Sequence, residues 1–537
     1  PAPVDSPIAG SRDPLSTPKP ITFLSFCTAS RGLVNERTIM QRLVLSLPNA
    51  TLSASADAQL IEQGDNFAII DASRVALLHG MESGQYYRSG HNSWSPSGWN
   101  SLSDAPLRVP SDERRTTADD PGADDTVRHH GSWMGAVVEE EGGAGFLIGA
   151  LAGGHPKVRA DEDVFVGFDE IRPARWFVSW GSEAEIFEAY VEQLRSRRRS
   201  PGQAPRVWCS WYSYYENVSW DVLAGQLPGL AKLGFTALQI DDGWQLNVGD
   251  WRPNAKFGHD LAACARYISD LGVTPGLWIA PFIAREGTPF LQAHPEAFVH
   301  GEDGKLAIAG YNWGGPYYAL DTTHPLAQEY LRDTIGYLLD AGIRYIKTDF
   351  INAAAIEGVR FDREASPDDA FILGSQILRE AAGEDTYLLG SGALIIPAIG
   401  LYDGIRVGCD VAPIWKNYAT DDRSDAEARN AFMGSVSRLW LRELIDVDPD
   451  VIFFRHMKNL LNDQQIGWLQ DVAAVAGFKS SSDPLVWLTE QEQAELSQWL
   501  ARHEDVQQIS RNVWSLDGRE VDFGPGLAEP EHCYPVS

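Results

Sequence analysis

The chain has 537 residues, with 74 acidic against 44 basic side chains and a formal net charge of −30. This charge argues against nucleic acid and against an anionic membrane surface as partners, and favours a neutral substrate. Five scattered cysteines form no CxxC or Cys/His cluster, which predicts neither a disulfide framework nor a zinc site and favours a reducing, cytoplasmic compartment.

The first 196 residues are expected to form an antiparallel β-sandwich domain. From about residue 20 to 180, short β segments such as RLVLSL, FAIID and WFVSW alternate with Gly, Pro, Asn and Asp turns, and helical periodicity is scarce. A helix, EAEIFEAYVEQLRSRR, leads into the basic, proline-bearing stretch 197–207, where we place the domain boundary. No segment reaches the ~18 to 20 apolar residues of a membrane span. We therefore expect no membrane insertion, and a secretion signal removed before residue 1 would leave no trace.

After residue 206, strand-like segments alternate with amphipathic helical ones such as PLAQEYLRDTIGYLLDAG and PDDAFILGSQILREAAG. This alternation is typical of a parallel sheet, and no GxGxxG or GxxxxGK[ST] motif follows a strand. Eight such units over residues 197–505 predict an α/β domain with a (β/α)8 TIM barrel rather than an open, doubly wound sheet. The strand candidates are 207–211, 237–241, 274–280, 345–350, 387–391, 404–408, 451–455 and a segment near 476–482.

The C-terminal residues 506–537 are expected to form only a short β segment. Thr489 and Glu492 make a capping box that opens the helix EQEQAELSQWLARH, which we take as the last barrel helix. The stretch VWSLDGREVDF then predicts a hairpin.

Side chains at the C-terminal ends of barrel strands point into the active-site mouth, so these positions are the first candidates for a functional site. A single aspartate there is often only the N-cap of the next helix, a cation is often an ion-pair partner, and a tryptophan often packs the barrel. The convergence of all three kinds of residue on one rim favours a functional site instead. The residues are Trp211, Tyr212, Asp241, Asp242, Trp278, Lys347, Asp349, Arg406 and Asp410.

Aromatic walls with several carboxylates and no phosphate-binding motif are typical of a carbohydrate site. Glycoside hydrolysis needs one carboxylate that attacks the anomeric carbon or activates water, and a second that protonates the leaving oxygen. Asp349 is the predicted nucleophile, because Lys347 shares its face of the strand and would keep it ionised. Asp410 lies in the apolar stretch CDVAPIW, where desolvation would keep it protonated as the acid. The adjacent Asp241 and Asp242 suit the recognition of sugar hydroxyls.

The motifs WCSWYSYY, ALQIDDGWQ, PGLWIAPF, YIKTDF, GIRVGCDVAPIW and DPDVIFFR resemble, in order and spacing, the barrel of glycoside hydrolase family 36. This family belongs to the α-galactosidase clan, and the likeness is greatest to its short, single-chain prokaryotic α-galactosidases. The resemblance extends to GHNSWSPSGW at 90–99, which looks like the loop that carries a tryptophan from the β-sandwich to the active site. It implies a retaining mechanism with Asp349 as the nucleophile and Asp410 as the acid/base.

The resemblance also implies substrate contacts, with Asp241 and Asp242 accepting hydrogen bonds from the 4- and 6-hydroxyls of galactose. An axial 4-hydroxyl distinguishes galactose from glucose, and its loss would leave buried acceptors unpaired. Two positions depart from the family pattern: Ser391 stands where this subgroup often has cysteine, and Cys409 where proline is frequent. Ser391 is expected near the sugar 2-position, which leaves the choice between hydroxyl and acetamido open. The implied contact residues are Trp94, Trp211, Tyr212, Asp241, Asp242, Trp278, Lys347 and Arg406.

We therefore expect a retaining, exo-acting α-galactosidase for substrates of the melibiose and raffinose type, without metal or cofactor, as a monomer or small homo-oligomer. The alternatives are a galactosyltransferase of the raffinose-synthase type, an α-N-acetylgalactosaminidase or α-glucosidase on the same scaffold, and a catalytically inactive sugar-binding protein. The sequence does not specify the natural aglycone, the pH optimum or the hydrolysis-to-transfer ratio.

Overall fold

A computed structural model describes residues 43–81, 83–108, 119–120, 125–199, 204–258, 260–419 and 422–528 of the chain. Within these ranges no helix has both the length and the apolarity needed to cross a membrane. Cys209, Cys264 and Cys409 are buried free thiols. Cys27, Cys533 and part of the predicted linker at 197–207 lie outside the described residues.

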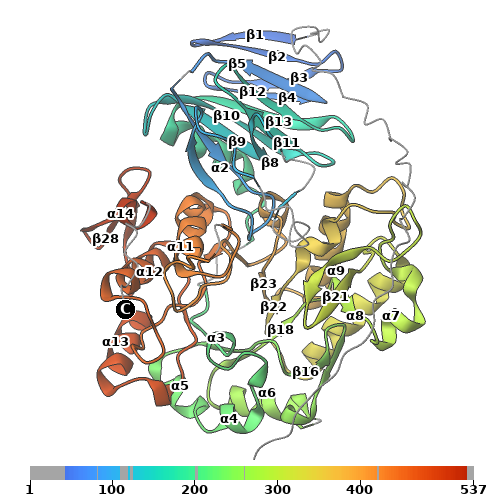
Figure 1. Cartoon of the computed structure of the whole chain (residues 1–537), viewed down its shortest axis with the longest axis vertical. Coiled ribbons are helices and arrows are strands. Elements are labelled where there is room, and N and C mark those ends of the chain that lie inside the picture. The colour runs from blue at the N-terminus through green and yellow to red at the C-terminus, as the bar shows by residue number, and fades with distance from the viewer. Residues whose placement is uncertain are drawn as a thin grey trace, which may run out of the picture. The chain divides into compact units, whose positions relative to one another are not determined.

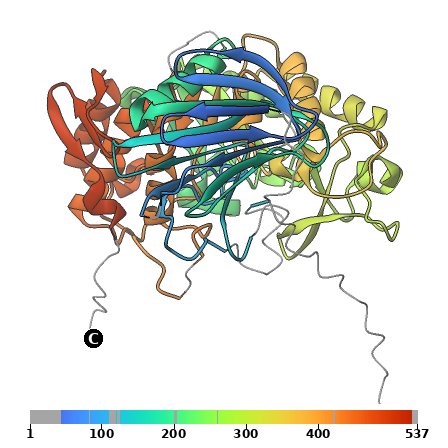
Figure 2. The same ribbon diagram turned by 90° about the horizontal axis from the view of Figure 1, so that it is seen from above.

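The N-terminal part consists of two antiparallel sheets, as predicted, whose strands overlap as layers in Figure 2. One sheet runs in the order β1 (Leu43–Leu47), β2 (Ala50–Ala54), β5 (Arg74–Leu78), β12 (Val164–Phe168), β11 (Lys157–Ala160) and β8 (His129–Ser132). The other runs β3 (Gln59–Gln63), β4 (Phe67–Ala72), β13 (Ala174–Ser182), β10 (Ala144–Ala152), β9 (Met134–Val138), β6 (Gln85–Arg88) and β7 (Gly98–Ser101).

The centre of the second sheet is covered on both faces. Six consecutive residues of β10, 145–150, are buried, which matches a strand packed between two layers rather than one that alternates between core and solvent. Helix α2 (Glu183–Arg195) packs on β10 and β13 and begins with a capping box between Ser182 and Glu185. The approach is close: a Cβ at Gly149 would lie 2.5 Å from the Tyr190 ring of α2, so glycine is required there.

The second half of the chain is built on one eight-stranded parallel sheet, with α8 and α9 on one side of its strands and α11 and α12 on the other in Figure 1. A parallel bridge joins Ile452 to Ser481. The strand order is β25 (Asp446–Asp448), β24 (Gly404–Arg406), β23 (Tyr387–Gly390), β22 (Tyr345–Thr348), β18 (Thr274–Ile279), β15 (Ala237–Ile240), β14 (Val207–Cys209) and β26 (Ser480–Ser481).

Seven of the eight predicted strands of this sheet lie where the sequence placed them, and the seventh in chain order was placed wrongly. It spans Asp446–Asp448 rather than 451–455. The apolar run at 451–455 suggested a strand, but Asp450 has a φ of +84°, which ends the extended backbone before that run. The half-buried Asp446 and the buried Asp448 of the true strand make polar contacts, with Tyr387 Oη 2.9 Å from Asp446 Oδ2 and Arg406 Nε 3.1 Å from Asp448 Oδ2.

Helices alternate with these strands and begin at recognisable signals. The predicted capping box of Thr489 and Glu492 opens α13, and the hairpin predicted after it forms between β28 and β29. Residues 220–233 form two short helices rather than one, because Pro228 lacks the N–H needed inside a helix and stands at the start of the second. The helices of this half of the chain include α4 (Trp220–Ala224), α5 (Leu227–Leu233), α6 (Leu261–Asp270), α8 (Pro325–Asp340), α9 (Pro367–Ala382), α11 (Ala428–Ser437), α12 (Asp463–Ala476) and α13 (Glu490–Ala501). After them, a small antiparallel sheet consists of β27 (Val506–Gln508), β28 (Val513–Leu516) and β29 (Arg519–Asp522).

The loop between β6 and β7 is bound to the parallel sheet through a buried arginine. The Arg438 guanidinium donates to the carbonyls of Asn92, Ser93 and Ser95 in this loop, at 2.8 to 2.9 Å, and to Val407 O at 2.6 Å. Burial lowers the pKa of Arg438 to about 10, although Tyr87 and Asp119 act in the opposite direction. These bonds fix the position of Trp94, which stands in the middle of the loop.

A buried ion-pair cluster joins the same region to the start of α9. His155 Nδ1 lies 2.9 Å from Asp368 Oδ1, and His155 Nε2 lies 2.9 Å from Asp120 Oδ2. Burial lowers the pKa of His155, but the carboxylates of Asp368 and Asp120 raise it by a larger amount. The pKa of His155 therefore lies well above 6.5. The donor atoms of His91, His155 and Asp368 lie within 4.8 Å of one another, as in a metal site. An imidazolium bonded through both nitrogens, however, has no lone pair to give to a metal.

We predict that His155→Gln lowers the free energy of unfolding by about 3 kcal/mol at pH 6, because it leaves two buried carboxylates without their cation. The folded pKa of His155 is raised, so its contribution is full below about pH 6.5 and is lost as the pH rises through the folded value. The pKa values of Asp120 and Asp368 are lowered, so their contributions are lost only in acid.

Urea unfolding at pH 6 and at alkaline pH measures this difference. His456→Gln is the matched control, because His456 also contacts two carboxylates but its side chain is 67% exposed. We expect little change in the control. Equal losses for the two variants, or a loss for His155→Gln that grows with pH, would contradict the account.

Candidate functional site

The centre of the site is one buried ammonium group shared by two carboxylates. Lys347 lies on β22, and its Nζ is 3.0 Å from Asp241 Oδ2 and 3.6 Å from Asp349 Oδ2. Thr348 points the other way and donates to Leu389 O, as the two-residue period of a strand requires. Burial lowers the pKa of Lys347, but the charges of Asp241 and Asp349 raise it above its usual value. Lys347 is therefore a fixed positive charge.

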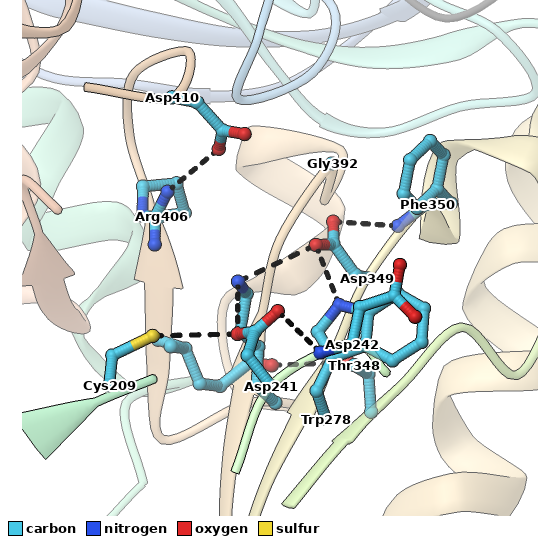
Figure 3. Close-up of polar contacts among 12 residues, drawn as sticks. Cys209, Asp241, Asp242, Trp278, Thr348, Asp349, Phe350, Gly392, Arg406 and Asp410 are labelled. Atoms are coloured by element: carbon cyan, nitrogen blue, oxygen red, sulfur yellow. Dashed lines mark hydrogen bonds and ion pairs between the residues drawn. The ribbon is translucent and has the colours of Figure 1, made fainter. Parts of the chain in front are cut away.

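The Asp349 carboxylate is held in one orientation, as Figure 3 shows. Its Oδ2 accepts from Trp278 Nε1 at 3.0 Å, and its Oδ1 accepts from the Phe350 N–H at 2.9 Å. Phe350 has a φ of +53°, so the chain turns sharply after the strand and brings this N–H back to the carboxylate. Each oxygen of the Asp349 carboxylate therefore accepts a hydrogen bond from a fixed N–H group.

Asp410 stands in a different environment. Its Oδ1 lies 3.3 Å from Arg406 Nη1, and its side chain is 43% exposed, whereas the Arg406 side chain is 3% exposed. Desolvation by the surrounding protein raises the pKa of Asp410, although Arg406 and Lys347 act in the opposite direction. The site thus pairs a tightly hydrogen-bonded carboxylate with a carboxyl group that retains its proton to higher pH.

Arg406 is already neutralised by two aspartates that the sequence analysis missed. Its Nε lies 3.1 Å from Asp448 Oδ2, and its Nη1 lies 2.8 Å from Asp450 Oδ2. Tyr212 also donates its hydroxyl to Asp450. The motif DPDVIFFR contains both aspartates, but the strand expected at 451–455 would begin after them and so predicts no role for them.

Asp242 is bound by Trp313, a further residue that the sequence analysis missed. Trp313 Nε1 donates to Asp242 Oδ2 at 2.7 Å, and Gln245 Nε2 donates to Asp242 Oδ1 at 2.5 Å. Trp313 lies at the turn between β20 (Ile308–Asn312) and β21 (Gly315–Ala319), in a small sheet that the chain inserts between β18 and β22. Burial raises the pKa of Asp242, against these two hydrogen bonds. The sequence NWGG indicates a turn, but it does not indicate that Trp313 in this turn contacts Asp242.

Trp94 reaches the same region from the N-terminal part. Its ring meets that of Phe350 edge-on, with 5.1 Å between centroids. Gly392 has a φ of +70°, and a Cβ there would lie 3.2 Å from the Trp94 ring, so glycine makes room for the indole. Beside it the Ser391 hydroxyl is buried without a hydrogen-bond partner among the described residues. Trp211 packs its ring edge-on against Tyr215, with 5.2 Å between the ring centroids.

The chain is similar to glycosidases of known structure. A family model described as Melibiase matches residues 183–380. TtGalA, an α-galactosidase from Thermus thermophilus solved in complex with p-nitrophenyl α-D-galactopyranoside, is 36% identical with a TM-score of 0.84, over 90% of this chain and 99% of that one. A GH36 α-galactosidase AgaA variant from Geobacillus stearothermophilus has a TM-score of 0.58 at 16% identity, over 85% of this chain and 68% of that one, and is alike in fold alone.

Curated relatives match over shorter stretches. The A type blood α-D-galactosamine galactosaminidase of Flavonifractor plautii is 33% identical over 111 residues, which make up 20% of this chain and 10% of that protein. The matched stretches cover between 10% and 24% of the length of the curated relatives.

We predict that Lys347→Met lowers the free energy of unfolding by about 3 to 5 kcal/mol at pH 7, because it strands two buried carboxylates. Adding Asp241→Asn should recover part of this loss, since the second change removes one of the stranded charges. Urea unfolding of both variants measures the coupling. Lys305→Met is the control, because Lys305 pairs with Asp303 while its side chain is 84% exposed, and no measurable loss is expected. A double variant less stable than Lys347→Met would contradict the shared-charge description.

Proposed function

The chain belongs to glycoside hydrolase family 36, and we propose that it is a retaining, exo-acting α-galactosidase that releases terminal α-linked galactose. The observation that carries the proposal is the contrast between Asp349, fixed beside a buried cation, and Asp410, whose pKa is raised. The likeness to TtGalA, at 36% identity over 99% of that chain, supports the choice of sugar. Substrates of the melibiose and raffinose type follow from the family.

In the proposed reaction Asp349 attacks the anomeric carbon while Asp410 gives its proton to the leaving oxygen. The galactosyl group is then bound to Asp349 as an ester, and Asp410, now ionised, accepts a proton from the water that cleaves this ester. Lys347 and the indole N–H of Trp278 contact the Asp349 carboxylate and hold its orientation before the attack. The same two groups stabilise Asp349 when it leaves in the second step.

We assign galactose recognition to the pair Asp241 and Asp242, whose buried oxygens are suited to accept hydrogen bonds from the 4- and 6-hydroxyls. Gln245 and Trp313 orient Asp242, and Lys347 orients Asp241, so both acceptors are preorganised. A glucoside, with its 4-hydroxyl equatorial, would leave one buried acceptor unpaired at a cost of about 1 to 3 kcal/mol. Trp94, Trp211, Tyr212, Trp278, Ser391 and Arg406 are proposed as the remaining walls of the sugar site.

We further propose that the parallel sheet is a closed (β/α)8 barrel, with a β-sandwich domain at 1–196, the barrel at 197–505 and a short β segment at 506–537. The pairing of β26 with β14 and the bridge from Ile452 to Ser481 support closure, because they link the segment after β25 to the first strand through β26. In such a barrel the site lies at the C-terminal ends of the strands.

A second candidate is an α-N-acetylgalactosaminidase, because the Flavonifractor relative is named for galactosamine, a galactose with nitrogen at the 2-position. The two enzymes would share Asp349 and Asp410 and differ at the sugar 2-position, near which we place Ser391. Kinetics on nitrophenyl α-galactoside, α-N-acetylgalactosaminide and α-glucoside separate them. We expect kcat/KM on the galactoside to exceed that on each of the others by about 10²-fold or more. Predominant turnover of the α-glucoside would overturn the roles given to Asp241 and Asp242.

Removing either carboxyl group should abolish most activity, but with different dependence on the leaving group. Asp349→Ala is expected to lose about 10³-fold or more in kcat on every substrate, since no covalent intermediate forms. Asp410→Ala should lose about 10² to 10⁴-fold in kcat/KM on raffinose but far less in kcat/KM on a nitrophenyl galactoside, whose leaving group needs no proton. Equal losses in kcat/KM on both substrates would argue against Asp410 as the acid.

The raised pKa of Asp410 also sets the direction of the pH dependence. Because the proton donor must be protonated in the free enzyme, kcat/KM on raffinose should fall as the pH rises through the pKa of Asp410. This alkaline limb should disappear in Asp410→Ala. A limb that remains unchanged in that variant would show that another group titrates.

A further inference from the structure

Asp450 is a completely buried carboxylate just after β25. It contacts two neighbours of the proposed acid Asp410, namely the Arg406 side chain and the Val411 backbone. Its Oδ2 lies 2.8 Å from Arg406 Nη1 and accepts a hydrogen bond from the Val411 N–H at 2.9 Å. The same oxygen accepts a hydrogen bond from the Tyr212 hydroxyl. Val411 directly follows Asp410 in the chain. Asp450 therefore touches the guanidinium that contacts Asp410 and the backbone that carries it.

The chain accepts local strain to place this carboxylate. Asp450 has a φ of +84°, a left-handed conformation that costs a non-glycine residue of order 1 kcal/mol or more. The turn is fixed from three directions: the Asp450 N–H donates to Asp448 Oδ1 at 2.8 Å, Asp450 Oδ1 accepts the Val451 N–H at 2.7 Å, and Ser480 Oγ donates to Asp450 O at 2.9 Å. A residue needed only to fill the core would not require this arrangement.

We propose that Asp450 is a positioning residue for the proton-transfer step: it holds the Arg406 guanidinium against Asp410, balances its charge, and fixes the peptide that follows Asp410. The inference rests on the proposed function of Asp410 as the acid. It extends that function to a residue that touches neither the sugar nor the reacting atoms.

One guanidinium nitrogen makes the coupling direct. Arg406 Nη1 lies 3.3 Å from Asp410 Oδ1 and 2.8 Å from Asp450 Oδ2, so the two carboxyl groups share the same NH2 group of the guanidinium. The shorter contact is with Asp450, whose side chain is fully buried, while that of Asp410 is 43% exposed. Asp410 can therefore keep its proton beside a cation.

The surrounding charges give the sign of the effect. Asp410 faces Arg406 on β24, Lys347 and Asp349 at the end of β22, and Asp241 at the end of β15, and Asp450 faces Arg406, Asp410, Asp448 and Tyr212. Burial raises the pKa of Asp450 to about 6, so the two carboxyl groups titrate as a pair. Without the Asp450 charge, more of the Arg406 charge acts on Asp410 and lowers the pKa of Asp410.

The test is Asp450→Asn, assayed by kcat/KM against pH on raffinose and on a nitrophenyl α-galactoside. We expect the alkaline limb to move to lower pH by about 0.5 to 1 unit. At neutral pH we expect a loss of about 10 to 100-fold on raffinose and a much smaller loss on the nitrophenyl substrate. Asp446→Asn is the matched control, because Asp446 is a polar-bonded aspartate at the other end of the same strand that bonds Tyr387 instead of Arg406. The control should keep the wild-type limb.

If Asp450→Asn does not fold, Asp448→Asn replaces it, because Asp448 is the other carboxylate on Arg406 and should move the limb in the same direction by a smaller amount. A folded Asp450→Asn enzyme with an unchanged limb and equal losses on both substrates would overturn the positioning role while leaving the proposed function intact. A wild-type chain inactive on every nitrophenyl glycoside would overturn both.

Discussion

The ion pair of Lys347 with Asp241 and Asp349 is the interaction on which the rest of the site depends. It joins the ends of two strands, β15 and β22, through one ammonium group in a region closed to solvent. A buried charge is costly unless it is paired, so the three residues constrain one another more strongly than packing alone would. Trp278, on the strand between them, completes the arrangement by donating to Asp349.

The two cations of the site divide the roles of the two proposed catalytic carboxyl groups. Lys347 has two carboxylate partners, one of which is Asp349. Arg406 has three, and the two buried ones, Asp448 and Asp450, take most of its charge. Asp410 makes the longest of the three contacts with Arg406. Desolvation by the surrounding protein raises its pKa. The different environments of the proposed nucleophile and the proposed acid thus follow from how many carboxylates each cation contacts.

The sequence was sufficient for features that repeat locally, and insufficient for those that depend on distant partners. Strand alternation, capping boxes and the strand-end residues from Asp241 to Asp410 could be read directly. The strand at Asp446–Asp448 could not, because its aspartates are satisfied by Tyr387 and Arg406, which lie about 40 to 60 residues away in the chain. For the same reason Trp313 and Asp450 were missed, since each acts through a contact across the fold.

The central claim is that Asp349 becomes covalently bound to the sugar during turnover. A 2-deoxy-2-fluoro-α-galactosyl fluoride slows hydrolysis of such an intermediate, so the labelled enzyme can be digested and its peptides analysed by mass spectrometry. The account predicts one fluorogalactosyl group on the peptide that contains YIKTDF, at Asp349, with loss of activity in proportion to labelling. Labelling of Asp410 instead, or proton NMR showing β-galactose as the first product from an α-galactoside, would contradict it.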